Sequence, residues 1–269
     1  MTKVSDIYTE PHVPPPSPWL ALTEAHRAFA EIVSLKLSHR VLAKSPDGDG
    51  HPVMILPGFM GGDGYNAPIR RFLKTRNYDV HGWGLGRNLG PRNGVVERLE
   101  ASIKRLCDKH GGPVSLVGHS LGGIYAREIA RIMPDSVRQV ISLGSPFGEG
   151  RQSASYPARV FRALNPLDEL PLDQNLLADA PPVPTTSVYS HGDGIVNWVT
   201  SVQSNGHQQT QNIRIRGSHC GMTVNPTVWF LVAERLAQEH GQWQTFEPKK
   251  WASILYPAPV HDAMAAQAG

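Results

Sequence analysis

The sequence has little of what marks secreted, membrane-spanning or nucleic-acid-binding proteins. Its 269 residues contain two cysteines, Cys107 and Cys220, which do not make a disulfide framework. No apolar run approaches the roughly 18 residues that a transmembrane helix needs, and the proline-rich start lacks the apolar segment of a signal peptide. The lysines and arginines are scattered and the formal net charge is only +3, so we expect no nucleic-acid partner. A cytoplasmic protein is therefore expected.

The N-terminal part of the chain differs from the rest. Residues 1–18 are polar and rich in proline, and we expect them to form a flexible arm. Residues 19–45 are expected to form a helix that packs on the core. Its apolar residues recur at steps of three and four and define one face: Leu22, Ala25, Phe29, Ile32 and Leu35. The alternative for this helix is a peripheral membrane or oligomer contact.

Residues 46–147 and 185–245 alternate short apolar runs with amphipathic stretches. Apolar strands separated by helices predict a mostly parallel sheet with helices on both faces. We count about six strands, at 52–56, 78–83, 114–117, 137–143, 186–190 and 212–215.

Between the two parts of this core, the alternation of apolar strands and amphipathic helices is interrupted. Residues 148–184 are too long for an ordinary loop and predict a helical cap over the site. The C-terminal tail, 246–269, contains aromatic residues, so we expect part of it to pack on the domain.

The strongest chemical signal is Gly-His-Ser-Leu-Gly at 118–122. It directly follows an apolar strand and directly precedes a helix, which is the context that a G-x-S-x-G nucleophile requires. Glycines on either side allow the strand and the helix to approach closely. We therefore predict Ser120 as a nucleophile.

A serine nucleophile needs a base, and the base needs a group that orients it. His219, in GSHCGM, follows the last expected strand and is the predicted base. Asp193, in HGDG, follows the previous strand and is the predicted acid. The remaining candidates for the acid lie in the expected cap: Asp168, Asp173 and Asp179.

Two backbone N–H groups are expected to bind an oxyanion. Leu121 lies in the first turn of the helix, where its N–H has no intrahelical partner and sits at the positive end of the helix dipole. The loop after the first strand, at 56–62, supplies the second donor, which we assign to Phe59, with Met60 as the alternative. Apolar side chains near these residues indicate a substrate pocket: Met60, Phe147, Trp198 and Met222.

Four segments, LPGFMGG, GHSLGG, HGDGIVNW and GSHCGM, together resemble the α/β-hydrolase superfamily, on its lipase and carboxylesterase side. The resemblance covers roughly residues 52–240. It implies the α/β-hydrolase fold, the chain order Ser120, Asp193, His219 and no metal or organic cofactor. Two departures are that Pro57-Gly58 stands where family lipases often have His-Gly, and that a helix replaces the first strands of the full fold.

The function expected from these residues is hydrolysis of carboxylic esters through an acyl-enzyme on Ser120, as in a carboxylesterase or a lipase. The substrate would be a small-molecule or lipid ester with an apolar acyl group. An acyltransferase, a thioesterase or an amidase would use the same three residues. A non-catalytic binding module on this scaffold is the alternative from another class.

Overall fold

Six parallel strands form one sheet in the computed structural model, which describes residues 12–92, 94–165, 177–249 and 252–259. The strands are β1 (Pro52–Leu56), β2 (Asp79–Gly82), β3 (Val114–His119), β4 (Val137–Leu143), β5 (Thr185–Ser190) and β6 (Thr210–Ile215). Their spatial order is β2-β1-β3-β4-β5-β6, and every neighbouring pair is parallel. The predicted fold class, including the number of strands, is confirmed.

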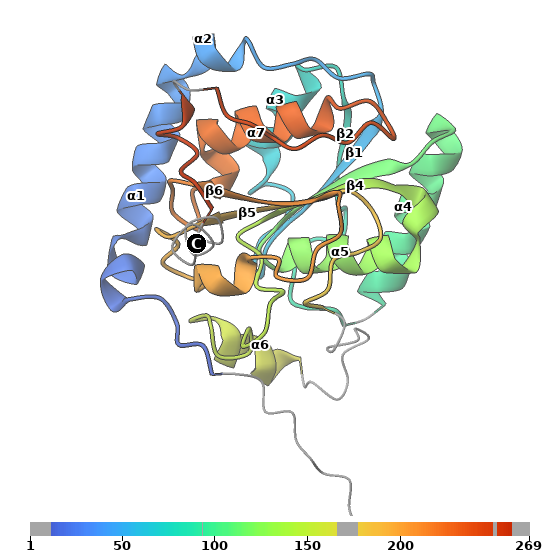
Figure 1. The fold of residues 1–269 in the computed structure, drawn as a ribbon. Helices are drawn as coiled ribbons and strands as arrows, with labels where there is room; N and C mark the ends of the chain where they lie inside the picture. The colour runs from blue at the N-terminus through green and yellow to red at the C-terminus, as the bar shows by residue number, and fades with distance from the viewer. Residues whose placement is uncertain (1–11, 93, 166–176, 250–251, 260–269) are drawn as a thin grey trace, which may run out of the picture.

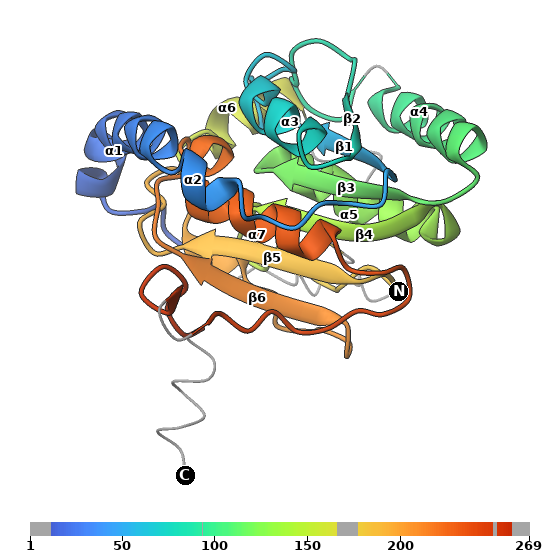
Figure 2. The same cartoon turned by 90° about the horizontal axis from the view of Figure 1, so that it is seen from above.

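Helices cover both faces of the sheet, α3 and α7 on one side and α5 on the other (Figures 1 and 2). Side chains alternate along β1, so that Val53 and Ile55 join one apolar cluster while Met54 and Leu56 join the other. The helices are α1 (Pro18–Leu37), α2 (His39–Leu42), α3 (Ala67–Lys74), α4 (Val95–His110), α5 (Leu121–Ile132), α6 (Ala158–Leu164) and α7 (Pro226–Leu236). Two buried cores therefore hold the sheet rigid between them.

Helix α1 contacts the body of the protein through its polar face, which reverses the expected orientation. Glu24 is buried, whereas Leu22 and Phe29 are 73% and 66% exposed. Of the predicted apolar face, only Leu35 packs against a core cluster. An amphipathic helix normally buries its apolar stripe; here the carboxylates of α1 bind loop N–H groups, as described below, and turn that stripe outward.

The arm before α1 is bound to the rest of the chain where the structure describes it. The backbone of Val13 and the Ser153 hydroxyl exchange hydrogen bonds, and the Tyr156 hydroxyl donates to the carbonyl of Pro16 at 2.8 Å. Part of the expected flexible arm, residues 12–17, therefore contacts the rest of the chain. Residues 1–11 lie outside the described residues.

The interrupting segment, 148–184, contains α6, and its residues 166–176 lie outside the described part of the chain. The tail packs on the sheet side that carries α7, where Phe246 and Tyr256 are buried in the core cluster. Within the described residues, no helix is both long enough and apolar enough to cross a membrane.

Helix α5 crosses β1 so closely that only glycine fits at the contact. A Cβ atom on Gly122 would lie 2.3 Å from the carbonyl oxygen of Leu56, which is part of a buried strand and cannot yield easily. We predict that Gly122→Ala lowers the free energy of unfolding by about 2 kcal/mol or more, since overpacking a tight core costs energy. Urea denaturation measures this difference.

Gly112 provides the matched control, because a Cβ there would meet no atom within 4 Å. Gly112→Ala should change the free energy of unfolding by less than about 1 kcal/mol. Equal urea midpoints for Gly122→Ala and the wild type would contradict the close crossing.

Candidate active site

Ser120 occupies a strained turn between β3 and α5. Its φ is 52° and its ψ is −121°, a region that residues with a side chain seldom enter. The turn is held because the N–H of Ser120 donates to the carbonyl of Leu143 at 2.8 Å. A Cβ on Gly118 would lie 2.3 Å from the carbonyl oxygen of Gly122, so the sequence around the turn permits no larger residue there.

Asp193 and His219 form a buried hydrogen-bonded pair. Asp193 follows β5, His219 follows β6, and His219 Nδ1 lies 2.6 Å from Asp193 Oδ2. The other oxygen, Asp193 Oδ1, accepts the N–H groups of Ile195 at 2.9 Å and Val196 at 2.7 Å. Three hydrogen bonds therefore fix the carboxylate, and His219 Nε2 is left as the ring nitrogen that can take a proton.

The pair lies beside the serine turn. The carbonyl of Leu143 accepts the hydrogen bond from Ser120, and Gly144 is the next residue. Gly144 also adjoins the pair, because a Cβ atom added to it would lie 3.2 Å from both Asp193 Oδ2 and His219 Nδ1. Among the described residues no hydrogen bond joins the Ser120 hydroxyl to His219, and such contacts often close only in the substrate complex.

His119, the residue before the serine, was missed by the sequence reasoning. Its Nε2 lies 3.0 Å from the backbone carbonyl of His219, and the two rings are 4.8 Å apart. Burial, and then the nearby His219, lower the pKa of His119 to about 3. The ring is therefore neutral and its Nε2–H supports the loop that carries His219. Its place next to Ser120 in the motif was the available signal.

The electrostatic setting of His219 suits a base. Burial alone lowers the pKa of this ring, but the charge of Asp193, the hydrogen bond to it and the charge of Glu24 outweigh burial and raise the pKa above its ordinary value. The imidazolium that forms when His219 takes a proton is thus stabilised.

Two backbone N–H groups beside Ser120 remain open. Within the described residues, neither Phe59 nor Leu121 uses its N–H in a backbone hydrogen bond, whereas the N–H of Met60 donates to Asn88 at 2.7 Å. The alternative donor, Met60, is therefore occupied. A Cβ on Gly58 would lie 3.1 Å from Ser120 Cβ, so this loop passes directly beside the serine.

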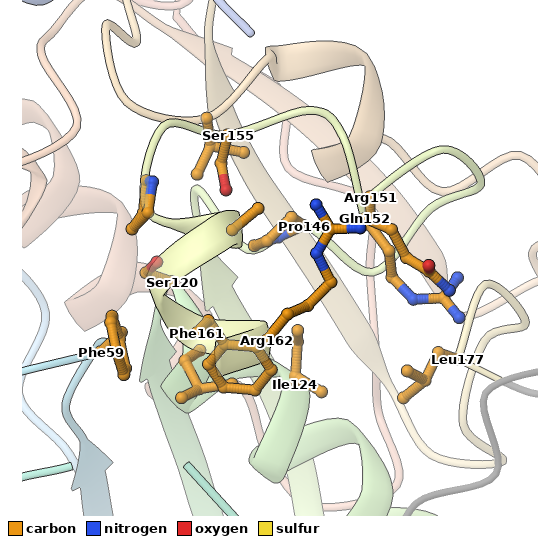
Figure 3. A pocket seen from close by; sticks show the side chains of 14 residues that line it. Phe59, Ser120, Ile124, Pro146, Arg151, Gln152, Ser155, Phe161, Arg162 and Leu177 are labelled. Atoms are coloured by element: carbon orange, nitrogen blue, oxygen red, sulfur yellow. The ribbon is translucent and has the colours of Figure 1, made fainter. Parts of the chain in front are cut away.

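A mostly apolar pocket opens at Ser120, between α5 and the segment that contains α6 (Figure 3). Phe59 and Phe161, which meet edge to face at 5.5 Å, lie on the serine side. The pocket is lined by Phe59, Ser120, Leu121, Ile124, Pro146, Arg151, Gln152, Ser155, Pro157, Ala158, Phe161, Arg162, Leu177 and Val196.

The four residues predicted for substrate binding do not line this pocket. Met60 is 52% exposed and Phe147 is buried under the guanidinium of Arg127. Trp198 stacks on His191, and the sulfur of Met222 lies beside Gly144, as Asp193 and His219 do. Their role in substrate binding stays a prediction, because apolar character alone does not separate core from pocket.

Of the three rival acids, the structure describes Asp179. Asp179 is exposed, and its side chain lies 3.5 Å from Asn205; Asp168 and Asp173 lie outside the described residues.

Among the residues that the structure describes, one group of side chains could hold a metal ion: Asp79, His81 and His110. It lies at the start of β2, the strand end opposite the site, and Asp79 Oδ2 already contacts Lys109 Nζ at 3.0 Å. A cation there would face that ammonium, so we assign it no role.

Comparison with known proteins agrees with this arrangement. A family model described as "Alpha/beta hydrolase family" matches residues 15–264. The chain belongs to the alpha/beta hydrolase family.

Individual relatives match about a third of this alpha/beta hydrolase. It is 32% identical over 99 residues to a protein named "Putative carbamate hydrolase RutD" from Azorhizobium caulinodans, covering 35% of this chain and 37% of the relative. It is 31% identical over 106 residues to a triacylglycerol lipase of Pseudarthrobacter phenanthrenivorans, covering 36% and 33%. The aligned part thus spans about a third of each curated relative.

Among solved structures, lipase B of Aspergillus fumigatus superimposes with a TM-score of 0.53 at 18% identity, covering 75% of this chain and 56% of that one. A likeness at this identity concerns the fold.

The Asp193–His219 contact predicts a large kinetic effect. Asp193→Asn keeps the shape of the side chain but no longer favours the required His219 tautomer or stabilises its imidazolium, so turnover should fall by up to about 10,000-fold. Steady-state kinetics with a p-nitrophenyl ester, on protein shown to be folded by circular dichroism, measures the loss. The control is Asp179→Asn, which should retain wild-type turnover; comparable rates for both variants would exclude Asp193 as the acid.

Proposed function

We propose that this alpha/beta hydrolase cleaves carboxylic esters by acyl transfer through Ser120. The observation that carries the proposal is the buried Asp193–His219 pair beside the strained serine turn. Strain of this kind is kept where the surrounding structure enforces it, and it commonly marks a functional site.

In the proposed mechanism, His219 Nε2 takes the proton of the Ser120 hydroxyl as the oxygen attacks the ester carbonyl. The N–H groups of Phe59 and Leu121 bind the resulting oxyanion, while Asp193 stabilises the imidazolium. His219 then returns the proton to the leaving alcohol. Water repeats the sequence on the acyl-enzyme and releases the carboxylic acid.

The pocket supports an apolar acyl group as the substrate's main recognition element. Ile124, Phe161 and Leu177 surround the space next to Ser120 with apolar surface. Burial of an acyl chain there would contribute roughly 0.8 kcal/mol for each methylene removed from water. The relatives named as lipases support the same substrate class.

Acyltransferase, thioesterase and amidase activities use the same residues with another acceptor or leaving group. The relative named "Putative carbamate hydrolase RutD" supports keeping an amide-like substrate as the second candidate.

Hydrolysis of p-nitrophenyl esters of increasing chain length, with and without a competing alcohol, tests the proposal. We expect hydrolysis with kcat/KM rising from acetate towards longer chains, and a loss of several orders of magnitude in Ser120→Ala. A fluorophosphonate should label wild-type Ser120 stoichiometrically and leave Ser120→Ala unlabelled. Unlabelled wild-type protein would indicate a binding module, and faster transfer to the alcohol than to water would indicate an acyltransferase.

A further inference from the structure

Glu24 connects the loop that carries the acid to the loop that carries the base. Its Oε2 accepts the N–H of Gly194 at 3.0 Å, and its Oε1 accepts the N–H of Cys220 at 2.7 Å. Gly194 follows Asp193 in the chain, and Cys220 follows His219. One buried carboxylate on α1 thus binds the residue immediately after each member of the pair.

Other contacts of α1 hold the same two loops. Arg27 pairs with Glu24 at 2.8 Å and donates to the carbonyl of Gly192. Glu31 accepts the N–H of Ser218 at 2.7 Å. The residues recur at three- and four-residue steps, which places them on one helix face, and this face is the one turned towards the site.

A carboxylate as buried as Glu24 persists only when hydrogen bonds and a countercharge replace the lost solvent. The N–H groups of Gly194 and Cys220 supply the hydrogen bonds, and the guanidinium of Arg27 supplies the countercharge. A Cβ on Gly194 would lie 2.4 Å from the carbonyl oxygen of Leu20, so the acid loop and α1 also meet without space between them.

We propose that α1 is a clasp in which Glu24 acts as a positioning residue, fixing Asp193 and His219 relative to each other. The proposal rests on the proposed hydrolase function for its kinetic consequences. Asp193 and His219 lie in the loops that follow β5 and β6. Ser190, the last residue of β5, joins these loops through a hydrogen bond from its hydroxyl to the carbonyl of Gly217 at 2.6 Å. Glu24 adds a second cross-link, at the residues directly after Asp193 and His219.

The charge of Glu24 also acts on His219. The groups around this ring are Asp193, Glu24 and His119, of which the first two raise its pKa while burial lowers it; His119 is neutral because its own pKa is about 3. Loss of the Glu24 charge therefore lowers the His219 pKa. Since the base must be unprotonated to act, the acid limb of the activity profile then moves to lower pH.

Glu24→Gln tests the clasp. We expect kcat on a soluble short-chain ester to fall roughly tenfold, because a small displacement of the base is costly. KM should stay near the wild-type value, since Glu24 does not line the pocket. The acid limb of kcat/KM should shift to lower pH, and NMR titration of the His219 ring should show the same lowered pKa.

Glu31→Gln is the matched control, because it also removes a loop-binding carboxylate from α1. Glu31 is absent from the groups that raise the His219 pKa, so its substitution should leave the acid limb in place. Thermal unfolding of both variants confirms that each is folded. An unchanged kcat and acid limb in Glu24→Gln, or equal shifts in both variants, would overturn the clasp.

The NMR titration keeps this test separate from the proposed function. A protein that hydrolyses no ester but loses the raised His219 pKa in Glu24→Gln would retain the clasp and refute the hydrolase. If instead the wild type hydrolyses esters, and Glu24→Gln has the same kcat and the same His219 pKa as the wild type, the hydrolase function is retained and the clasp is refuted.

The outer face of α1 carries a second, independent inference. It exposes a continuous apolar stripe, in which Trp19 is 71%, Leu22 73%, Phe29 66% and Leu37 78% exposed. A stripe of this size on a described helix is unusual for a surface in contact with water alone. Figure 1 shows α1 along one side of the molecule, with its length open to the outside.

The exposed charged side chains of this segment are basic. From Pro18 to Lys44 the carboxylates are Glu24 and Glu31, and both bind the site loops. Lys36, Arg40 and Lys44 are exposed. The outward surface is therefore apolar and positively charged, a combination that favours an anionic lipid surface. A second copy would place two positive surfaces against each other.

We infer that the outer face of α1 and α2 docks on an anionic phospholipid surface. Sedimentation with phosphatidylglycerol–phosphatidylcholine vesicles should recover the protein, and pure phosphatidylcholine should bind it roughly tenfold more weakly. The double variant Leu22→Ser, Phe29→Ser should lower binding to the anionic vesicles at least about tenfold and leave turnover of a soluble ester unchanged.

Ile254→Ser with Leu255→Ser is the control, because these exposed apolar residues lie on the tail, at 68% and 40% exposure. This variant should bind vesicles like the wild type. Equal vesicle binding by both double variants would overturn the inference, as would a dimer in native mass spectrometry that Leu22→Ser, Phe29→Ser dissociates.

Discussion

A buried carboxylate next to a buried imidazole is the constraint on which the rest of this site depends. Asp193 and His219 are 3% and 4% exposed, so every hydrogen bond that water would supply has to come from the protein. The backbone of residues 195 and 196, the ring of His119 and the carboxylate of Glu24 supply these bonds directly or to the adjoining backbone. The loops around the pair have the shapes that these contacts require.

The sheet and the helix outside it perform different tasks. In the parallel sheet the carboxyl ends of β3, β5 and β6 lie at a common edge, which sets the approximate positions of Ser120, Asp193 and His219. Orientation within a few tenths of an ångström comes from contacts beyond the strand ends, and here α1 makes several of them. This demand also explains the reversed orientation of α1: its charged residues have specific partners at the loops, and its apolar stripe is left on the outside.

The sequence predicted the strands closely because each is a short apolar run bounded by polar residues, and it predicted Ser120 because strand, turn and helix adjoin in the chain. The substrate residues Met60, Phe147, Trp198 and Met222 were not predictable in this way, since an apolar side chain near the site packs equally well in the core. Glu24 was missed for a related reason. Its partners, Gly194 and Cys220, lie 170 and 196 residues away, and no local pattern reveals contacts over that separation.

The sequence by itself determined the order of strands and helices, the tight serine turn and the identities of the residues that follow β5 and β6. These features depend on near neighbours in the chain, through backbone preferences and the period of apolar residues. Only the tertiary structure decided which face of α1 turns inward, which apolar side chains line the pocket and how the acid meets the base. Each of these depends on which partners satisfy buried polar groups, and that is settled only when distant segments come together.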